Sequence, residues 1–363
     1  MMQRDVGKSL EGLVGRIYDF ISQGEVPEIS MPSRNKDNIV LDQLLSVWKY
    51  GDSLVTRSGK TVEGAEYLVK LLYIIDFIRE MIRENKSSTL REMYYISEGW
   101  NLAKFHTQDE SNLLAEDLEV ISELLREDFK LRPEENGASI MGNITVEEKT
   151  RKGEFKRINC KDDVGDSGYS IPYTVEEEKL RIVDLDADFV LAIETGGMFD
   201  RLVENGFDES NRCLLVHLKG QPARSTRRLL KRINEEKGLP VVVFTDGDPW
   251  SFRIYASIAY GAIKTAHISH YLAVPTAEFI GITASDILNY DLPTDRLNDK
   301  DIAALNAELK DPRFNSEIWR DEIETMLRIG KKAEQQALAK YGLNYVTSTY
   351  LPEKLSNLTG YRW

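Results

Sequence analysis

The chain has 363 residues, of which 42% are hydrophobic and 29% are charged. That length is sufficient for two domains, and the balanced composition is typical of a soluble globular protein, which excludes fibrous and disordered classes. The longest apolar runs, such as residues 241–244, are far shorter than the roughly 20 residues of a membrane span, and the N-terminus lacks the apolar stretch of a signal peptide. We therefore predict a cytoplasmic protein that makes no membrane contact.

The formal net charge of −13 argues against tight binding of nucleic acid, because neutralisation of phosphates supplies much of the affinity for DNA. Two local clusters of cations nevertheless favour binding of nucleic acid. The first contains Arg224, Arg227, Arg228, Lys231 and Arg232, and the second contains Lys149, Arg151, Lys152, Lys156 and Arg157. Such clusters are usually only solvated faces. The sequence predicts weak, salt-sensitive DNA binding by this chain alone, with Arg224, Arg227, Arg228 and Lys231 as candidate DNA contacts.

The cysteines and histidines give no sign of a catalytic or zinc site. Cys160 and Cys213 lie far apart without metal-ligand spacing, which suits a reducing compartment and predicts inert packing. The histidines form no HExxH-like cluster. His217 falls within an apolar strand pattern, so we expect a buried structural residue there.

Residues 1–65 alternate short patterned stretches with turn formers and predict an N-terminal extension that docks on another surface. Apolar residues at helical spacing then predict helices over 66–84 and 113–125, with a shorter helix from Thr89 between them. Two strands follow, over 137–146 and 155–158. This order is typical of a winged helix-turn-helix (CAP-like) domain, which we place at residues 66–160.

In such a domain the helix after the turn enters the major groove and the hairpin contacts the DNA backbone. These roles would fall to Ser111–Leu125 and Lys149–Lys156 respectively. The alternative is a small helical domain with a hairpin and no ligand.

The middle helix carries two adjacent tyrosines. Thr89 and Glu92 form a T-x-x-E capping box, which predicts a helix through Tyr94 and Tyr95. Tyr94 falls on the apolar face, whereas Tyr95 shares a polar face with Arg91 one turn earlier. A phenol with a pKa near ~10 becomes a nucleophile only if its proton is removed or its anion is stabilised, and the Arg91 guanidinium suits that task or the holding of a phosphate.

From these residues alone, Tyr94 is predicted to pack and Tyr95 to be reactive. The competing interpretation is that Tyr95 is an ordinary amphipathic ring and Arg91 an ordinary surface charge.

After a polar linker near 161–170, strands and helices alternate and predict a mainly parallel sheet flanked by helices, with further helices toward residue 363. The predicted strands are 188–193, 213–218 and 240–244, and the predicted helices are 198–204, 223–236 and 250–261. Short apolar pieces at 271–274 and 278–282 are candidates to extend the sheet. The predicted fold is therefore α/β and multidomain.

Three carboxylates stand at the ends of two of these strands. Glu194 follows residues 189–193, and Asp246 and Asp248 follow residues 241–244. Carboxyl ends of parallel strands are where sites form, and hard oxygen ligands suit Mg²⁺. We expect Gly247, between the two aspartates, to leave room for a ligand. A lone D-x-D is commonly a polar turn, but a strand-terminal Glu in the same sheet makes the signal stronger.

These residues resemble the Toprim metal site shared by topoisomerases and primases, and four motifs in a fixed order narrow the resemblance. In chain order the motifs are Leu90-Arg91-Glu92-Met93-Tyr94-Tyr95, Ile193-Glu194-Thr195-Gly196-Gly197-Met198-Phe199, Gly220-Gln221-Pro222 with Thr226-Arg227, and Asp246-Gly247-Asp248-Pro249. Over nearly the whole chain the order is similar to that of the A-subunit family of archaeal DNA topoisomerase VI, which also resembles the eukaryotic meiotic double-strand-break transesterase. The first 65 residues carry little of the resemblance.

The resemblance implies that Tyr95 attacks a DNA phosphodiester, with help from Arg91, and becomes joined to the 5′ phosphate. It implies Mg²⁺ held by Glu194, Asp246 and Asp248 in a Toprim domain over residues 170–363. It also implies a nucleoid-associated A-subunit homodimer within an A2B2 heterotetramer, in which the B subunit binds ATP and meets residues 1–65 of this chain. The duplex passes through a transient double-strand break, giving relaxation or decatenation.

Two alternatives stay open at this point. One is a Toprim nuclease that uses water and forms no covalent link, and the other is a non-catalytic DNA-binding assembly subunit.

Overall fold

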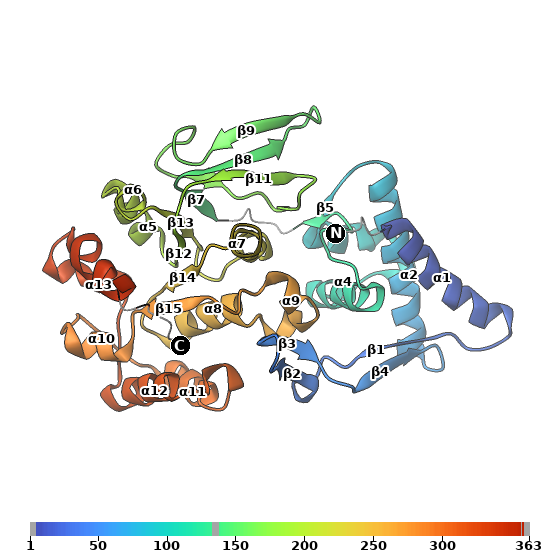
Figure 1. Cartoon of the computed structure of the whole chain (residues 1–363). Coiled ribbons are helices and arrows are strands. Elements are labelled where there is room, and N and C mark those ends of the chain that lie inside the picture. Colours follow the sequence, from blue (N-terminus) through green and yellow to red (C-terminus); the bar gives the residue numbers. More distant parts are fainter. Residues whose placement is uncertain (1–4, 133–137, 357, 359–363) are drawn as a thin grey trace. The chain divides into compact units, whose positions relative to one another are not determined.

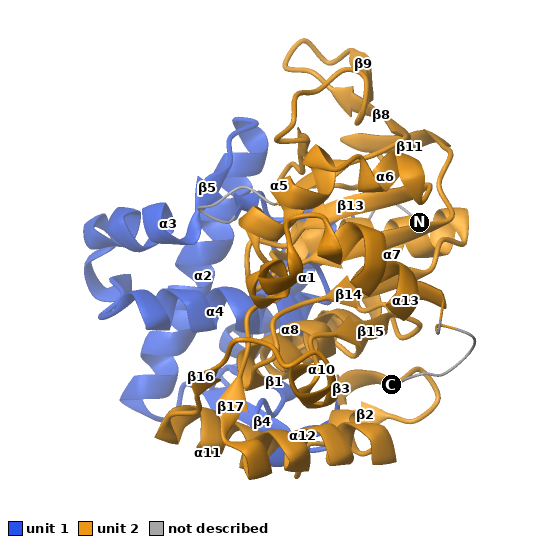
Figure 2. Cartoon of the chain, turned by 90° about the vertical axis from the view of Figure 1, so that its left-hand side faces the viewer, with its two compact units in different colours: residues 1–40, 50–135 blue, residues 41–49, 136–363 orange. Residues whose placement is uncertain are grey.

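The computed structural model of the chain describes residues 5–132, 138–356 and 358, and it divides into two compact units (Figure 2). Unit 1 comprises residues 1–40 and 50–135, and unit 2 comprises residues 41–49 and 136–363. The division therefore falls near residue 135, whereas the sequence suggested 160. The structure does not describe residues 1–4, 133–137, 357 and 359–363. Parts of the predicted domains and the start of the predicted 137–146 strand fall on these residues.

Unit 1 is built mainly from helices around one apolar core. Its elements are α1 (Val6–Ser22), β1 (Glu28–Pro32), β4 (Leu54–Ser58), α2 (Val62–Arg83), β5 (Ser88–Thr89), α3 (Leu90–Ile96), α4 (Gln108–Ser122) and β6 (Leu131–Arg132). β1 pairs antiparallel with β4, and β5 pairs parallel with β6. The three helices predicted between residues 66 and 125 are confirmed as α2, α3 and α4.

The expectation that residues 1–65 consist only of short patterned stretches and turn formers is wrong. Helix α1 has 17 residues, begins at the N-cap Asp5, and buries Leu10, Leu13 and Ile17 in the core of unit 1. Gly7, Gly12 and Gly15 interrupt the pattern, and glycine disfavours a helix by about 1 kcal/mol each relative to alanine, so local preference hid an element that burial stabilises.

The hairpin predicted as the wing of unit 1 belongs to unit 2. Strands β8 (Ile144–Lys149) and β9 (Phe155–Asn159) pair antiparallel, and β11 (Leu180–Leu185) adds a third strand beside β8. Ile144, Val146 and Leu180 are buried in the core of unit 2. The correction has a physical cause, because the apolar side of this hairpin packs into the core of unit 2, and its sheet is completed by β11, a later strand that the sequence did not mark.

The main sheet of unit 2 has the strand order β10-β7-β13-β12-β14-β15. The bounds are β7 (Ser139–Met141), β10 (Tyr169–Ser170), β12 (Phe189–Ile193), β13 (Cys213–His217), β14 (Val241–Phe244) and β15 (Glu278–Gly281). The last four pair in parallel, whereas β7 and β10 run antiparallel at one edge. The mainly parallel sheet is confirmed.

Residues 271–274 do not extend the sheet, because Ser269–Leu272 forms helix α9. There the Tyr271 ring lies against the Arg228 guanidinium of α7 (Arg224–Lys237), 3.7 Å from the ring centroid. A four-residue apolar run carries no period of its own, so its packing decides its structure.

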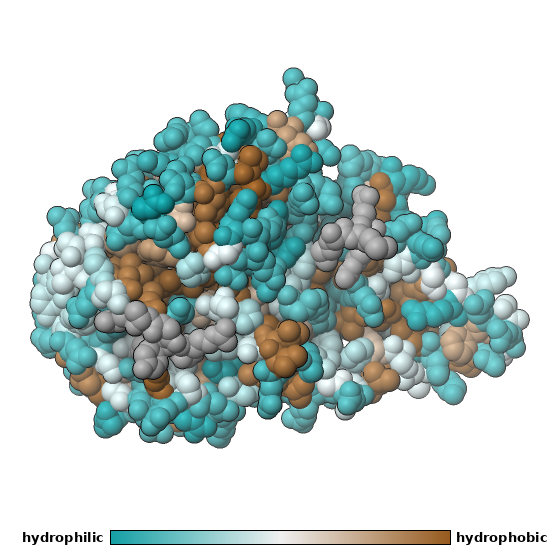
Figure 3. Space-filling view, viewed as in Figure 1, coloured by the Kyte–Doolittle hydropathy of each residue, from teal (hydrophilic) through white to brown (hydrophobic). Residues whose placement is uncertain are grey.

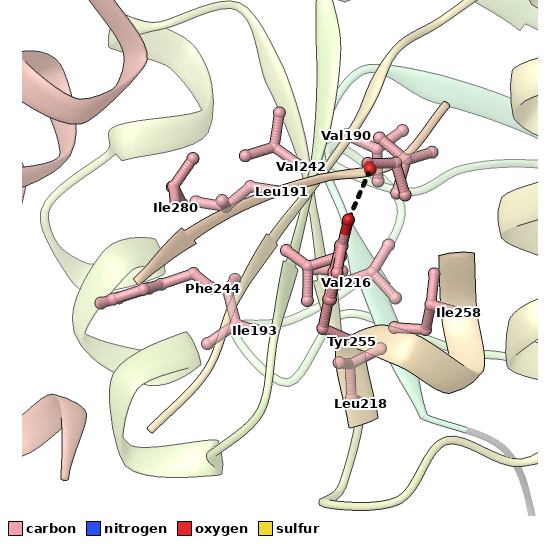
Figure 4. Close-up of a cluster of buried hydrophobic side chains, with 14 of the residues drawn as sticks. Val190, Leu191, Ile193, Val216, Leu218, Val242, Phe244, Tyr255, Ile258 and Ile280 are labelled. Atoms are coloured by element: carbon pink, nitrogen blue, oxygen red, sulfur yellow. Dashed lines mark hydrogen bonds between the residues drawn. The ribbon is translucent and has the colours of Figure 1, made fainter. Parts of the chain in front are cut away.

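Helices and aromatic side chains cover the central strands. The helices are α5 (Gly196–Glu204), α6 (Phe207–Ser210), α7, α8 (Pro249–Ala259), α9, α10 (Ala284–Asn289), α11 (Asp299–Glu308), α12 (Glu317–Ile329) and α13 (Leu351–Ser356), the last continuing a π-helix over Val346–Tyr350. Figures 1 and 2 place α5 and α7 on opposite sides of the central strands. Figure 4 shows Val216, Tyr255 and Ile258 packed together, with the Tyr255 hydroxyl donating to the Ala277 carbonyl at 3.3 Å.

Part of the predicted extension is built into unit 2. The short strands β2 (Ile39–Asp42) and β3 (Val47–Tyr50) pair with each other. The main-chain N–H of Trp48 donates to the Tyr260 carbonyl at 3.0 Å, and the Arg313 guanidinium lies 5.5 Å from the centroid of the Trp48 ring. These residues therefore stabilise unit 2 directly. Among the helices in the described ranges, none combines the length and the apolar character that a membrane span needs.

We predict that Gly12→Ala and Gly15→Ala each stabilise the protein by about 0.5 to 1 kcal/mol, because a Cβ at either position meets no atom within 4 Å and alanine favours the helix. Urea unfolding of each variant measures the shift. Gly142→Ala is the matched contrast, because Gly142 has a φ of +127° and its Cβ would lie 2.8 Å from the Cys213 carbonyl, so that variant should be destabilised. A loss of stability at Gly12 and Gly15 would contradict the prediction.

Candidate active site

The helix that carries the two tyrosines is fixed at both ends. The Glu92 N–H donates to Thr89 Oγ1 at 3.0 Å and the Thr89 N–H donates to Glu92 Oε2 at 2.7 Å, which confirms the predicted capping box. At the other end the Ser97 hydroxyl donates to the Tyr94 carbonyl at 2.6 Å and accepts from the Phe105 N–H at 3.2 Å. Because Ser97 is fully buried, the last turn of α3 is held against the core.

The two tyrosines differ in exposure as predicted. Tyr94 is half-buried against the core of unit 1, and Tyr95 is 59% exposed. Their ring centroids lie 5.4 Å apart. Arg91 is exposed on the same side of α3 as Tyr95. The helix therefore presents one phenol to solvent from a rigid base.

A hollow of about 440 Å³ opens beside Tyr95, and it contains residues that the sequence did not suggest. Its lining consists of Leu90, Arg91, Tyr94, Tyr95, Gln108, Asn112 and Arg132. The Gln108 side-chain amide donates to the Leu90 carbonyl at 3.3 Å, which ties α4 to the start of α3. Arg132 comes from strand β6 and has a buried Nε with no hydrogen-bond partner in the described part of the chain.

Arg132 lies 37 positions after Tyr95, so no local pattern could have linked the two. The parallel pairing of β5 with β6 brings them together, since β5 leads directly into α3. A hollow with two guanidinium groups beside a phenol suits an anionic ligand such as a phosphate diester.

The three predicted carboxylates meet at one edge of the sheet in unit 2, and each accepts a main-chain hydrogen bond. Glu194 Oε2 accepts from the Asp246 N–H at 3.0 Å, Asp246 Oδ1 from the Gln335 N–H at 2.8 Å, and Asp248 Oδ1 from the Ser251 N–H at 2.8 Å. A carboxylate has two oxygens, so one oxygen of each acid lies outside these three bonds. Asp248 also serves as the N-cap of α8.

Burial and mutual repulsion change the acidity of this group. Burial, together with the charges of Glu194, Asp248 and Glu334, raises the pKa of Asp246 to about 7 against the lowering effect of the Gln335 N–H. Burial and Asp248 also raise the pKa of Glu194. The acids are therefore close enough to repel one another, and a cation among them would relieve the repulsion.

The chemistry of this donor set fits Mg²⁺, which prefers carboxylate oxygens together with water and phosphate oxygens. Within the described residues, no three acidic, histidine or cysteine side chains are already arranged as ligands of one metal ion. Among the described residues the three carboxylates thus lie near one another, but they are not yet positioned as ligands of one metal ion.

A late segment of the chain closes this site, and no local sequence pattern marks it. The fully buried Gln335 donates its side-chain amide to the Phe244 carbonyl at 3.0 Å and accepts at its Oε1 from the Thr195 hydroxyl at 3.0 Å. Gln335 therefore joins the ends of β12 and β14 while its N–H holds Asp246.

Gly247 is explained by packing against the protein. Its N–H donates to the Ala333 carbonyl at 2.8 Å, and a Cβ at this position would lie 3.0 Å from the Ile282 carbonyl and 3.3 Å from the Ala333 carbonyl. The expectation that Gly247 leaves room for a ligand is therefore replaced by a requirement for close approach of two backbone segments.

The basic helix α7 uses much of its charge inside unit 2. The Arg228 guanidinium pairs with Glu176 at 2.9 Å, Lys231 pairs with Glu235 at 3.1 Å, and Arg227 is buried. Arg224 is half-buried near the start of the helix. These contacts give the cations structural roles, and their predicted role in DNA binding stays a prediction.

The charged side chains of the helix predicted to enter the major groove also form ion pairs within the protein. Helix α4 contains no lysine or arginine, and its Asp117 and Glu119 are buried and pair with Arg34 and Arg126. The helix therefore offers little positive charge to phosphates.

The cysteines are buried as predicted, whereas His217 is less buried than the sequence suggests. Cys160 and Cys213 are buried free thiols, and burial raises the pKa of Cys160 to about 12. His217 is half-buried with its ring stacked on Phe199 at 5.6 Å between centroids, and burial lowers its pKa.

Comparisons with known proteins match the chain over most of its length. Three family models match: type IIB DNA topoisomerase over residues 66–131, the all-beta domain in DNA topoisomerase VI alpha subunit over 134–186, and the Toprim domain shared by Spo11 and the A subunit of topoisomerase 6 over 189–355. The middle match agrees with the placement of the β8–β9 hairpin outside unit 1.

Several relatives, each named as the A subunit of type 2 DNA topoisomerase 6, are similar over nearly their whole length. The relative from Archaeoglobus fulgidus is 58% identical over 98% of this chain and 98% of its own. The relative from Natronomonas pharaonis is 57% identical over 95% and 94%, and that from Methanosarcina mazei is 54% identical over 94% and 92%.

We predict that, without metal, Asp246→Asn gains stability relative to the parent protein as pH rises. The pKa of Asp246 is about 7 when folded and near 3.9 in an unfolded chain, so the contribution of its protonated form is complete below pH ~4 and is lost as pH rises through about 7. Between pH 5 and pH 8 the difference in unfolding free energy should move by on the order of 2 kcal/mol in favour of the variant.

Urea unfolding in EDTA measures this difference, with Asp321→Asn as the control because Asp321 is exposed. A pH-independent difference for Asp246→Asn would contradict the raised pKa.

Proposed function

This chain belongs to the family of A subunits of type 2 DNA topoisomerase 6, the DNA-cleaving subunit of a type IIB topoisomerase, and from that premise we propose that Tyr95 is its nucleophile. The observation that carries the proposal is the exposure of the Tyr95 phenol on a doubly anchored helix, in a hollow that Arg91 and Arg132 also line. Tyr94, its neighbour, is half-buried and serves packing.

In the proposed reaction the Tyr95 oxygen attacks the phosphorus of a DNA phosphodiester and loses its proton. The bond from phosphorus to the 3′ oxygen breaks, the 3′ oxygen takes up a proton, and the 5′ phosphate stays on the tyrosine. Arg91 and Arg132 would bind the phosphate oxygens and favour the phenolate. Two such cuts on opposite strands make the transient double-strand break through which a second duplex passes.

We propose that Glu194, Asp246 and Asp248 hold Mg²⁺, which when bound would neutralise the phosphate and stabilise the departing oxygen. Gln335 would keep Asp246 in place through its N–H, and Ser251 would do the same for Asp248. The Asp246 carboxyl must release its proton for this role, and a bound cation would lower its raised pKa.

We also propose the partners that the family implies: duplex DNA, a second copy of this chain, and a B subunit that binds ATP, in an A2B2 assembly. Contact of the N-terminal region with the B subunit is supported by its exposed apolar side chains. Tyr18 and Ile21 lie exposed on α1, and Leu44 and Leu45 lie exposed in the turn between β2 and β3.

The winged-helix (CAP-like) character of unit 1 stays a proposal supported by the succession of α2, α3 and α4 and by the β5–β6 pair. The proposal does not extend to groove reading by α4, because that helix carries no cation.

We predict that Tyr95→Phe abolishes covalent adducts while Tyr94→Phe retains them, because Tyr95 is 59% exposed whereas Tyr94 is half-buried against the core of unit 1. The chain is mixed with its B subunit, ATP, Mg²⁺ and supercoiled plasmid, quenched with detergent, and tested for protein on 5′ ends. Adducts from Tyr95→Phe at the parent level would refute the assignment. Cuts with free ends would indicate a Toprim nuclease, and DNA binding without cuts would indicate an assembly subunit.

We predict that Mg²⁺ raises the melting temperature of the parent protein more at pH 8 than at pH 6, since protons compete with the cation at Asp246. Asp248→Asn should lose most of this shift, although asparagine retains the N-cap of α8, which an alanine would lose at a cost of about 1 kcal/mol. Differential scanning calorimetry with Mg²⁺ or EDTA measures the shift, and an equal shift in Asp248→Asn would remove Asp248 from the metal site.

A further inference from the structure

The outward face of the small sheet in unit 2 carries a concentration of positive charge. Cross-strand neighbours share a face, and the register pairs Glu147 with both Arg157 and Arg181 and pairs Lys149 with Phe155. The alternate residues, including Val146 and Leu180, are buried. Lys149, Phe155, Arg157 and Arg181 therefore lie on the face opposite the core.

One cation and one ring on this face are held together. The Arg181 guanidinium lies 3.9 Å from the centroid of the Phe155 ring, which confirms that β11 and β9 share this side across β8. Arg151 extends the same charge into the β8–β9 turn. We call the set Lys149, Arg151, Phe155, Arg157 and Arg181 the basic sheet face.

The cations of this face differ from those of helix α7. All four are exposed, and none forms an ion pair with any other described residue. In α7, by contrast, Arg228 and Lys231 are largely buried and paired with glutamates. Residues 144–159 contain three acids, Glu147, Glu148 and Glu154, against five cations, so positive charge is in excess there on a chain whose net charge is −13.

The hairpin is also accessible. Figures 1 and 2 show β8 and β9 projecting from the rest of unit 2, and in Figure 3 hydrophilic side chains cover the upper edge where they lie. Exposed guanidinium and ammonium groups with a stacked aromatic ring fit a phosphate backbone, and a flat sheet face can track one strand of a duplex without reading bases.

We propose that the basic sheet face is a duplex-DNA contact surface of unit 2, separate from the hollow beside Tyr95. It uses backbone phosphates and carries no sequence preference of its own. The contact adds affinity and orients a duplex relative to unit 2. The proposal rests on the action of this family on DNA but not on the assignment of Tyr95.

The test measures affinity of the full chain for a short fluorescent duplex in EDTA, between about 50 and 200 mM KCl. The variant Lys149→Gln, Arg151→Gln, Arg157→Gln, Arg181→Gln should flatten the slope of log K against log salt by about 0.9 for each phosphate that it no longer neutralises, roughly 2 to 4 in all, and weaken binding about 10- to 100-fold.

The matched control removes the same charge elsewhere on unit 2: Lys264→Gln, Lys300→Gln, Lys310→Gln, Arg320→Gln, all exposed positions. Its slope should stay that of the parent. A second variant exchanges lysine and arginine at the four positions of the basic sheet face and should keep the slope, because the charge is retained.

If the control variant lost as much of the salt slope as the first variant, the effect would come from net charge alone, and the proposal would be overturned. An unchanged slope in the first variant would also overturn it, and if B-subunit binding then fell instead, the face would bind an acidic protein. Thermal melting of each variant checks that it is folded. An error about Tyr95 would appear only in the adduct assay and would leave these slopes unchanged.

Discussion

The amide side chain of Gln335 is buried at the edge of the sheet in unit 2, and the arrangement of the acidic site depends on it. Its Nε2 donates to the carbonyl of Phe244 and its Oε1 accepts from Thr195, so the ends of two neighbouring strands are joined by one side chain. Its main-chain N–H then holds Asp246. Three acids that repel one another are kept near each other by neutral hydrogen bonds, which do not cancel their charge.

This use of neutral donors has a consequence for function. Arginine or lysine side chains in the place of these main-chain donors would hold the acids more strongly but would neutralise them, and a metal ion would gain less by binding. Main-chain N–H groups fix the position of Glu194, Asp246 and Asp248 while leaving their combined negative charge for a metal ion. Burial and the neighbouring carboxylates raise the pKa values of Glu194 and Asp246, and a bound cation would oppose that rise.

Sequence reasoning found the parts that depend on local pattern. The capping box at Thr89, the difference between Tyr94 and Tyr95, the parallel strands and the gathering of Glu194, Asp246 and Asp248 all follow from spacing within a helix or from the ends of parallel strands. Arg132 and Gln335 were missed because they reach their sites through long-range pairing. The hairpin predicted from strands at 137–146 and 155–158 is placed in the wrong unit, because chain order does not reveal that β11, more than 20 residues later, completes its sheet.

The charges show the same distinction between pattern and packing. In the sequence, the cations of α7 and those of the β8–β9 hairpin look alike, and only burial separates them. The Arg228 guanidinium pairs with Glu176 and lies over the Tyr271 ring. A long cationic side chain that buries its aliphatic part needs such a partner for its charged group. The exposed cations of the hairpin have no such partner within the described residues and keep their charge for an outside ligand. An acidic protein can therefore bind a polyanion where its unpaired cations are gathered on one accessible face, because screening at physiological salt limits the repulsion from distant acids to a range of about 8 Å.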